Sequence, residues 1–342
     1  MPAKKKIYKL PTYLAPREKN NKHKYKYIPK KIFQTGGSCE VTKGMYDAVH
    51  TWIDKNPDWE YYFFDDKACR DFIKEYFPKK VLDAYDNLIP GAYKADLWRY
   101  CVLYIHGGLY VDNKCVLLAS SLNDVIPEDV EFLSVLDRYL ETMEFSGYIY
   151  QAFICSKSKH PFLEKVIDMV VENAEIGSYG YDQLSPTGPG LLGKAINLAI
   201  DRQENESHMV GINNVSGFKY ILWKNGYSEN GCVVDEGNMA ILRNHYLEYY
   251  DECRKKGISS YHDLWFLGLV YKNRKGALNH LKPIENNPNT YNLFIRYLYR
   301  KKSYKEARIH VLKFIFKCPL SIYPVTKSVF RYEVLERIKN FL

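Results

Sequence analysis

Hydrophobic and polar positions in the first third of the chain alternate with the periods of strands and helices. The segment 28–36, IPKKIFQTG, predicts a strand centred on Ile32-Phe33 that ends at a glycine turn. A helix is expected across residues 45–53, and the aromatic run 59–64 predicts a second strand after an Asn-Pro-Asp turn. Strand, helix and strand within about forty residues are typical of a parallel βαβ unit.

The clearest helical pattern lies in residues 91–108. Its apolar positions fall on one stripe with spacings of i, i+4, i+7, i+8 and i+11, namely Tyr93, Leu97, Tyr100, Cys101 and Tyr104. Gly107 stands where a left-handed C-terminal cap is needed. The apolar triplet 109–111 then predicts a short buried strand.

Later segments continue the alternation and change character near residue 277. We expect strands at 130–136 and 153–156, and helices at 161–173 and 191–200. Beyond residue 277, apolar positions alternate with Lys and Arg. The sequence therefore predicts an α/β fold class with three parts, a flexible basic arm (1–27), one domain (28–276) and a basic helical appendage (277–342).

The charge is distributed unevenly along the 342 residues. Residues 1–31 hold eleven Lys/Arg against one acid, and residues 271–342 hold sixteen against four, whereas the middle holds 22 against 35 acids. An acidic body argues against a nucleic-acid-binding domain. The basic ends are either solvated or suited to an anionic surface such as a membrane.

Cysteine usage and hydropathy point to a reducing compartment. The eight cysteines are scattered without a Cys-x-x-Cys pair, which is neither a zinc pattern nor a disulfide framework. The sequence shows no signal-peptide pattern and no apolar run near the roughly 18 residues of a membrane span. We therefore expect a cytoplasmic protein.

Candidate chemistry gathers around Asp112, directly after the predicted strand 109–111. Asp96 and Arg99 on the preceding helix are spaced i, i+3 and project from one face. Alone, they would be a surface ion pair and Asp112 a turn former. Because helix, Gly-Gly turn and strand are contiguous, the three side chains can meet in one cleft at the carboxyl end of a strand. Two carboxylates and a guanidinium suit a polyhydroxylated ligand.

The stretches KADLWRY (94–100) and YIHGGLYVDNK (104–114) resemble the DXD-type glycosyltransferases of family 32. This is the family of the yeast initiating α-1,6-mannosyltransferase and of capsular-polysaccharide sugar transferases, with a more distant likeness to clostridial glucosylating toxins. Four other stretches agree in order, so that the resemblance covers roughly residues 28–270: IPKKIFQTG, SKHPFLEKVI (158–167), TGPG (187–190) and YHDLW (261–265). The set is specific, although each stretch alone is weak.

The resemblance implies a GT-A-like, Rossmann-type nucleotide-sugar domain that transfers a sugar with retention of anomeric configuration. The donor would be a UDP- or GDP-sugar, and the acceptor a glycan, glycolipid or protein. The residues expected to bind substrate are Asp96, Arg99, Tyr100, Gly107, Gly108, Asp112, Lys114, Gly188 and Trp265, of which Asp96, Arg99 and Asp112 form the catalytic set. Trp265 would donate its indole N–H to the departing diphosphate.

Lys114 departs from the family pattern, because it stands where the second Asp of the DXD should bind metal. Two hypotheses follow. Either Mn²⁺ or Mg²⁺ still binds through Asp112, substrate phosphates and His262 or Asp263, or the Lys114 ammonium replaces part of the cation's charge. This lysine variant looks like bacterial or large-DNA-virus relatives.

The sequence leaves some assignments open. His245 is a rival to His262 for the histidine role, and the pairs 65–66 and 137–138 are secondary candidates because each follows an apolar strand. The alternative function is a catalytically degenerate sugar-nucleotide-binding or adaptor protein.

Overall fold

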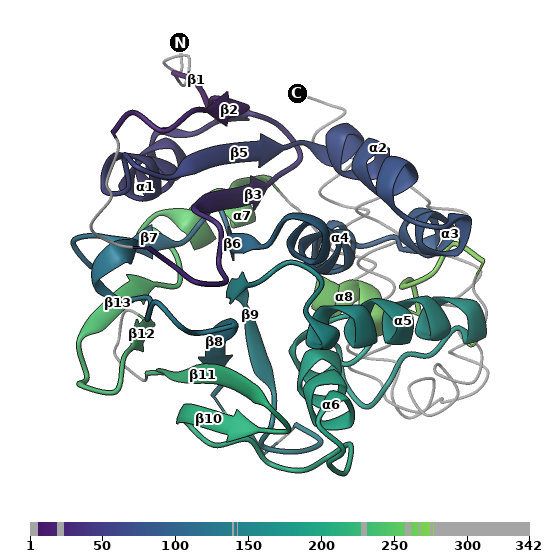
Figure 1. Ribbon diagram of the computed structural model, residues 1–342. Coiled ribbons are helices and arrows are strands. Elements are labelled where there is room, and N and C mark those ends of the chain that lie inside the picture. The colour runs from purple at the N-terminus through teal and green to yellow at the C-terminus, as the bar shows by residue number, and fades with distance from the viewer. Residues whose placement is uncertain are drawn as a thin grey trace, which may run out of the picture.

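The computed structural model describes residues 6–18, 24–138, 140–141, 143–226, 231–256, 261–266, 268–273 and 276. The appendage predicted for residues 277–342 lies outside the described residues. The described chain forms a large mixed sheet with helices packed against it (Figure 1).

In the part of the chain that the structure describes, the main sheet has eleven strands. Ten follow one path in the order β2 (Tyr13–Leu14), β5 (Glu60–Phe64), β3 (Lys31–Thr35), β6 (Gly108–Val111), β9 (Ile149–Ser156), β8 (Phe132–Leu136), β11 (Phe218–Asn225), β12 (Cys232–Val234), β13 (Ala240–Arg243) and β7 (Val116–Leu117), while β10 (Gly211–Val215) pairs with β11 off this path. Within the described residues, two further strands, β1 (Tyr8–Lys9) and β4 (Glu40–Val41), pair only with each other.

Strand direction in the centre of the sheet determines where a ligand can sit. β3 is parallel to β5 and to β6, and β8 is parallel to β11. β9 is antiparallel to both β6 and β8, so it lies between two parallel sets that run the same way. The carboxyl ends of β5, β3, β6, β8 and β11 therefore share one edge, where open α/β sheets bind their ligands.

The helices cover the two faces of the sheet unequally. They are α1 (Lys43–Asp54), α2 (Asp66–Tyr76), α3 (Lys79–Asn87), α4 (Gly91–His106), α5 (Pro161–Ile176), α6 (Pro189–Ala199), α7 (Tyr249–Lys256) and α8 (Tyr261–Phe266), with a short 3-10 helix at Leu122–Asp124. Side chains of α2 to α6 form one buried cluster, and side chains of α1 belong to the other. Among the described helices, none is both long and apolar enough to cross a membrane.

Successive side chains of the central strands point alternately into the two buried clusters. Ile32 and Leu109 point into the α1 cluster, whereas Phe33 and Tyr110 point into the cluster of α2 to α6. All four side chains are at most 1% exposed. Strands that are buried on both faces carry near-continuous apolar runs. Such runs in the sequence predicted β3 and β6.

The predicted helix 91–108 is confirmed as α4, but its single apolar stripe is too narrow a description. Nine of its residues are buried, Asp96, Trp98 and Arg99 among them. α4 contacts α5, α3, α2 and β6 together, so most of its surface faces protein. Gly107 ends the helix with a positive φ of 64° but an extended ψ of −172°, which differs from a left-handed helical cap.

The expectation of a free N-terminal arm is wrong for the described residues 6–18 and 24–27. β1 pairs with β4, β2 pairs with β5, and Leu10 is 1% exposed. The Tyr25 hydroxyl donates to the backbone oxygen of Leu122 at 3.2 Å. Strands of two residues leave no period in a sequence, and the lysines around them suggested solvent instead.

The remaining predicted elements are confirmed with shifted ends. The strand expected at 130–136 begins at Phe132, and the one expected at 153–156 begins earlier, at Ile149. α2, α3 and the strands β10 to β13 were not anticipated.

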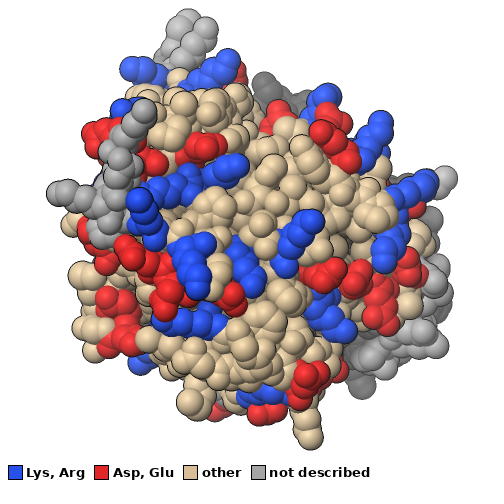
Figure 2. All heavy atoms as spheres, viewed as in Figure 1, with Lys and Arg blue, Asp and Glu red and all other residues tan. Residues whose placement is uncertain are grey.

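On the face seen in Figure 2, basic and acidic side chains are interspersed over the described surface.

Gly108 occupies a position that only glycine can fill. Its φ is +104°, and an added Cβ would lie 2.6 Å from the backbone oxygen of Lys31 on the neighbouring β3. We expect Gly108→Ala to reduce the free energy of unfolding by on the order of 2–4 kcal/mol, measured by urea denaturation.

Gly91→Ala is the matched control, because a Cβ there meets nothing within 4 Å and the residue opens α4. This substitution should leave stability unchanged or raise it by about 0.5–1 kcal/mol. Equal effects of the two substitutions would contradict the close approach of β6 to β3.

Candidate active site

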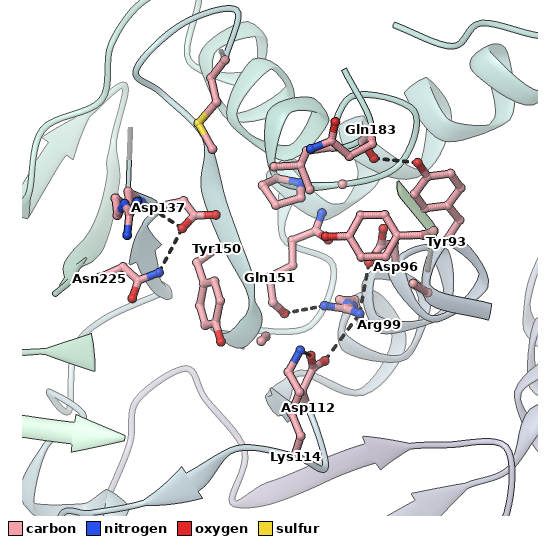
Figure 3. A pocket seen from close by; sticks show the side chains of 18 of the residues that line it. Tyr93, Asp96, Arg99, Asp112, Lys114, Asp137, Tyr150, Gln151, Gln183 and Asn225 are labelled. Atoms are coloured by element: carbon pink, nitrogen blue, oxygen red, sulfur yellow. Dashed lines mark hydrogen bonds and ion pairs between the residues drawn. The ribbon is translucent and has the colours of Figure 1, made fainter. Parts of the chain in front are cut away.

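A cavity of about 570 Å³ opens at the shared carboxyl edge of the strands. α4 supplies Asp96 and Arg99 to its lining, the segment after β6 supplies Asp112 and Lys114, and the start of β9 supplies Gln151 (Figure 3). The structure therefore brings the predicted helix pair and the predicted strand-end carboxylate into one cavity.

Asp96 and Arg99 lie one turn apart on α4, and both side chains are almost fully buried. Arg99 Nη2 is 3.1 Å from Asp96 Oδ1. The other carboxylate oxygen, Oδ2, accepts a hydrogen bond of 2.7 Å from the Thr187 hydroxyl. Asp96 is thus held from both sides, by its own helix and by the loop before α6.

The Arg99 guanidinium is fixed by contacts from four directions. Its Nη1 donates to the backbone oxygen of Gln151 at 2.8 Å, and its Nε donates to that of Ala95 at 3.2 Å. The Tyr110 ring centroid lies 4.4 Å from the guanidinium carbon, and Asp112 Oδ1 lies 3.6 Å from Nη2. With these partners, Arg99 positions the neighbouring side chains and balances the charge of the carboxylates, and its guanidinium is less suited to a bidentate contact with a ligand.

Asp112 is surrounded by groups that favour its charged form. The Tyr110 hydroxyl donates to Oδ1 at 2.8 Å, and Lys114 Nζ lies 3.1 Å from Oδ2. Burial by itself would raise the pKa of Asp112, but Lys114, Arg99 and the Tyr110 hydroxyl outweigh it and lower the pKa to about 2. Asp112 is therefore ionised at any ordinary pH.

Lys114 is the counterpart of this carboxylate. Burial would lower its pKa, yet the charge of Asp112 outweighs burial and raises it, so the ammonium stays protonated. Its Nζ also lies 5.6 Å from the centroid of the Tyr249 ring. A permanent cation therefore stands two residues after Asp112, inside the cavity.

Asp96 differs from Asp112 in its protonation. Burial is the largest influence and raises the pKa of Asp96 to about 6, although Arg99 and the Thr187 hydroxyl act in the opposite direction. Its carboxyl thus titrates close to neutral pH, which is a common property of residues in functional sites.

Five of the nine predicted substrate-binding residues line the cavity, namely Asp96, Arg99, Asp112, Lys114 and Gly188. Gly107 and Gly108 are not in the lining, because their backbone packs against Ser158 and Lys31 at the turn between α4 and β6. These two glycines allow the turn between α4 and β6 to pack closely against neighbouring backbone. The substrate contact predicted for them does not fit this position.

Two aromatic residues predicted to bind substrate are turned into the protein. The Tyr100 hydroxyl donates to the backbone oxygen of Thr187 at 3.0 Å and accepts from Gln151 Nε2, beneath the cavity. The Trp265 indole N–H donates to the backbone oxygen of Tyr179 at 2.7 Å. In this structure the indole N–H that the prediction assigned to a diphosphate is used in the core, and Trp265 is not in the cavity lining.

The histidine candidates lie outside the cavity lining. His262 is exposed on α8, and only its neighbour Tyr261 reaches the cavity. His245 stacks on Tyr249 and its Nδ1 lies 3.1 Å from the backbone oxygen of Tyr246. Asp65 is also accounted for, since its carboxylate caps α2 by accepting from the Ala68 N–H at 2.8 Å.

The residues present do not fit a divalent ion held by Asp112 and His262. One oxygen of Asp112 faces Lys114 Nζ and the other faces Arg99 and the Tyr110 hydroxyl, so an ion there would meet two fixed positive charges. Within the described residues, no group of three or more His, Cys, Asp or Glu is arranged to hold a metal.

Several lining residues were not identified from the sequence. Gln151 and Tyr150 come from β9, Tyr93 from α4 and Tyr261 from α8. A glutamine ahead of the apolar run 152–155 was a usable signal, because a polar residue in a buried strand needs a partner. Thr187 lies in the TGPG loop that the sequence singled out, but its bond to Asp96 depends on the tertiary structure.

Part of the chain is similar in sequence to known proteins. Residues 42–132 match the family described as "Glycosyltransferase sugar-binding region containing DXD motif". Inositol phosphoceramide mannosyltransferase 2 of Schizosaccharomyces pombe is 31% identical over 165 residues, which are 47% of this chain and 44% of that protein. The initiation-specific alpha-1,6-mannosyltransferase of Candida albicans is 29% identical over 203 residues, covering 49% of this chain and 52% of that protein.

The chain spans about half the length of the curated relatives it matches. Among solved structures, PaToxG glycosyltransferase matches with a TM-score of 0.40 and 16% identity, over 51% of this chain and 71% of that chain.

The raised pKa of Asp96 predicts how stability depends on pH. The unfolded carboxyl ionises near its ordinary value of 3.8 and the folded one only near 6. Relative to Asp96→Asn, the native protein should therefore lose on the order of 2–3 kcal/mol of unfolding free energy as pH rises from about 4 to about 7, measured by urea denaturation.

Asp112→Asn is the control with the opposite sign. The pKa of Asp112 is lowered to about 2, so its stabilising contribution is present above the unfolded value and is lost as pH falls toward 2. Between pH values of about 5 and 7 this contribution should stay constant. A constant Asp96 contribution over that range would contradict the raised pKa and show that attraction to Arg99 outweighs burial.

Proposed function

We propose that this protein is a glycosyltransferase, on the premise that its residues 42–132 belong to the family of DXD-containing glycosyltransferase sugar-binding regions. The family resemblance inferred from the sequence is confirmed for this segment. The observation that carries the proposal is the charged network in which the buried Asp96 and Arg99 meet the partly buried Asp112 and Lys114 on one cavity at the carboxyl edge of the sheet.

The donor is a nucleotide sugar in this proposal, and a mannosyl donor is favoured by the names of the relatives. Asp96 and Asp112 accept hydrogen bonds from hydroxyl groups of the sugar, because a carboxylate is the strongest acceptor for a hydroxyl pair. The mixed sheet, with its ligand edge at the carboxyl ends of parallel strands, supports a GT-A-like donor domain.

The diphosphate of the donor needs positive charge, and Lys114 is the group that can supply it. Its ammonium is protonated, lines the cavity and stands two residues beyond Asp112. Of the two hypotheses for the altered motif, the geometry favours replacement of the metal's charge by Lys114. The leaving diphosphate gains electrostatic stabilisation from a fixed cation of this kind.

Transfer is proposed to retain the anomeric configuration, as the family resemblance implies. The bond from the anomeric carbon to the diphosphate oxygen breaks with its electron pair on that oxygen, and the acceptor oxygen forms the new bond on the same face. The departing oxygen takes the acceptor's proton, so no protein base is assigned. The acceptor is a glycan or glycolipid, consistent with the named relatives.

The rival function is a sugar-nucleotide-binding protein that has lost catalysis. The feature that supports it is Arg99, whose donors are largely used inside the protein, together with the altered DXD at Lys114. Tight binding of nucleotide sugars without hydrolysis or transfer under any ionic condition would favour this rival.

Removal of metal tests the role of Lys114. We expect hydrolysis of GDP-mannose or UDP-glucose to persist within about twofold in EDTA, and Lys114→Met to lower kcat/KM by about 10²–10³-fold. Lys157→Met is a matched control, since Lys157 is similarly half-buried and ion-paired, to Glu131 at 2.9 Å. Complete loss of activity in EDTA, restored by Mn²⁺, would overturn the lysine hypothesis.

Asp112→Asn tests the transferase assignment itself. Loss of this carboxylate removes an acceptor for the sugar and leaves Lys114 without its partner, so donor hydrolysis should fall by at least about 100-fold. Circular dichroism and thermal unfolding would show that the variant is folded. Unchanged hydrolysis in both Asp112→Asn and Asp96→Ala would exclude this cavity as the active site.

A further inference from the structure

The cavity continues past Gln151 to a second set of polar side chains. Asp137 follows the carboxyl end of β8, and Asn225 ends the neighbouring parallel strand β11. Both line the same cavity as Asp96 and Asp112, and Figure 3 shows them on the far side of Tyr150 and Gln151 from Arg99. The cavity therefore has two polar ends separated by the start of β9.

Asp137 is held in place by one of its two carboxylate oxygens. Oδ1 accepts hydrogen bonds from Asn225 Nδ2 at 2.9 Å and from the Arg138 backbone N–H at 2.8 Å. Both of the hydrogen bonds accepted by this carboxylate from the described residues thus use Oδ1. The Asn225 amide is oriented in turn, because its Oδ1 accepts from Asn244 Nδ2 at 3.2 Å.

Tyr261 of α8 lines the same cavity as the carboxylates of both ends, Asp96 and Asp112 at one and Asp137 at the other. A ligand that occupies the whole cavity would contact Asp96 and Asp137 at once.

The two ends differ in the ligand they can accept. The end near Asp112 holds two cations, the buried Arg99 and the half-buried Lys114, and suits phosphate. The other end presents the carboxylate of Asp137 and the amide of Asn225, and the lining of the cavity also includes three apolar side chains, those of Leu140, Met143 and Leu184. Arg138 also lines this end, and the charge of its side chain partly offsets that of Asp137. A desolvated carboxylate repels phosphate and accepts hydrogen bonds from neutral hydroxyl groups.

We propose that Asp137, oriented by Asn225, binds a hydroxyl group of the acceptor, and that the acceptor presents a polyol such as a sugar or cyclitol at this end of the cavity. The inference rests on the proposed transferase function and extends it to a residue for the second substrate. Asp137 orients the acceptor through its hydroxyl, while the transferred proton goes to the departing diphosphate as described above.

The test compares two reactions of the Asp137→Asn variant, hydrolysis of the donor and transfer of its sugar to a polyol acceptor. GDP-mannose and UDP-glucose serve as donors, with water, methyl α-mannoside or myo-inositol as acceptors. We expect hydrolysis to stay within about twofold of the native rate, whereas kcat/KM for the polyol acceptors falls by about 10- to 100-fold through a higher acceptor KM. Retained hydrolysis also shows that the variant is folded.

Asp129→Asn is the matched control, because Asp129 precedes β8 whereas Asp137 follows it. The Asp129 carboxylate lies on the exposed surface, where it pairs with Lys219 at 2.6 Å. Its loss should leave both reactions unchanged. Equal loss of hydrolysis and transfer in Asp137→Asn, or unchanged transfer, would overturn the assignment. Native protein that hydrolyses a donor but glycosylates neither polyol would also overturn it, whereas absence of donor hydrolysis would contradict the transferase proposal instead.

Discussion

A buried guanidinium, that of Arg99, is the contact on which the rest of the cavity depends. It joins α4 to β9 through the backbone oxygen of Gln151, and to β6 through the Tyr110 ring and Asp112. Taking such a charge out of water costs several kcal/mol unless it is paired and hydrogen-bonded. The three elements must therefore keep their mutual positions, or the guanidinium is left without compensation.

The charges around Arg99 balance within the protein. Two carboxylates, Asp96 and Asp112, face two cations, Arg99 and Lys114. An Asp in place of Lys114 would leave an excess of negative charge that calls for a bound cation. With lysine there, the protein carries its own counter-charge, which is the physical basis for proposing transfer without a resident metal.

The insertion of antiparallel β9 between two parallel sets of strands gives the cavity its two ends. β6 delivers Asp112 on one side of β9, and β8 and β11 deliver Asp137 and Asn225 on the other. The cationic end suits the charged donor, and the end with carboxylate and amide suits hydroxyl groups. A single sheet edge can thus hold both substrates of a transfer reaction side by side.

The local part of this design could be predicted from the sequence. α4, the Gly-Gly turn and β6 are contiguous, so the i, i+3 spacing of Asp96 and Arg99 and the short strand before Asp112 were enough to bring these groups together. Strong periodicity also identified β3, α1 and α5, because one or both faces of these elements are buried.

Contacts between distant segments were decided only by the tertiary structure. Strand order placed Asp137 and Asn225 opposite Asp112, and no local period encodes which strands become neighbours. Burial likewise turned the Trp265 indole toward Tyr179 and away from the cavity, since a buried N–H must find an acceptor wherever the packing provides one. The sequence by itself thus determined the helix–turn–strand unit with its three charges, and the sheet decided what faces it.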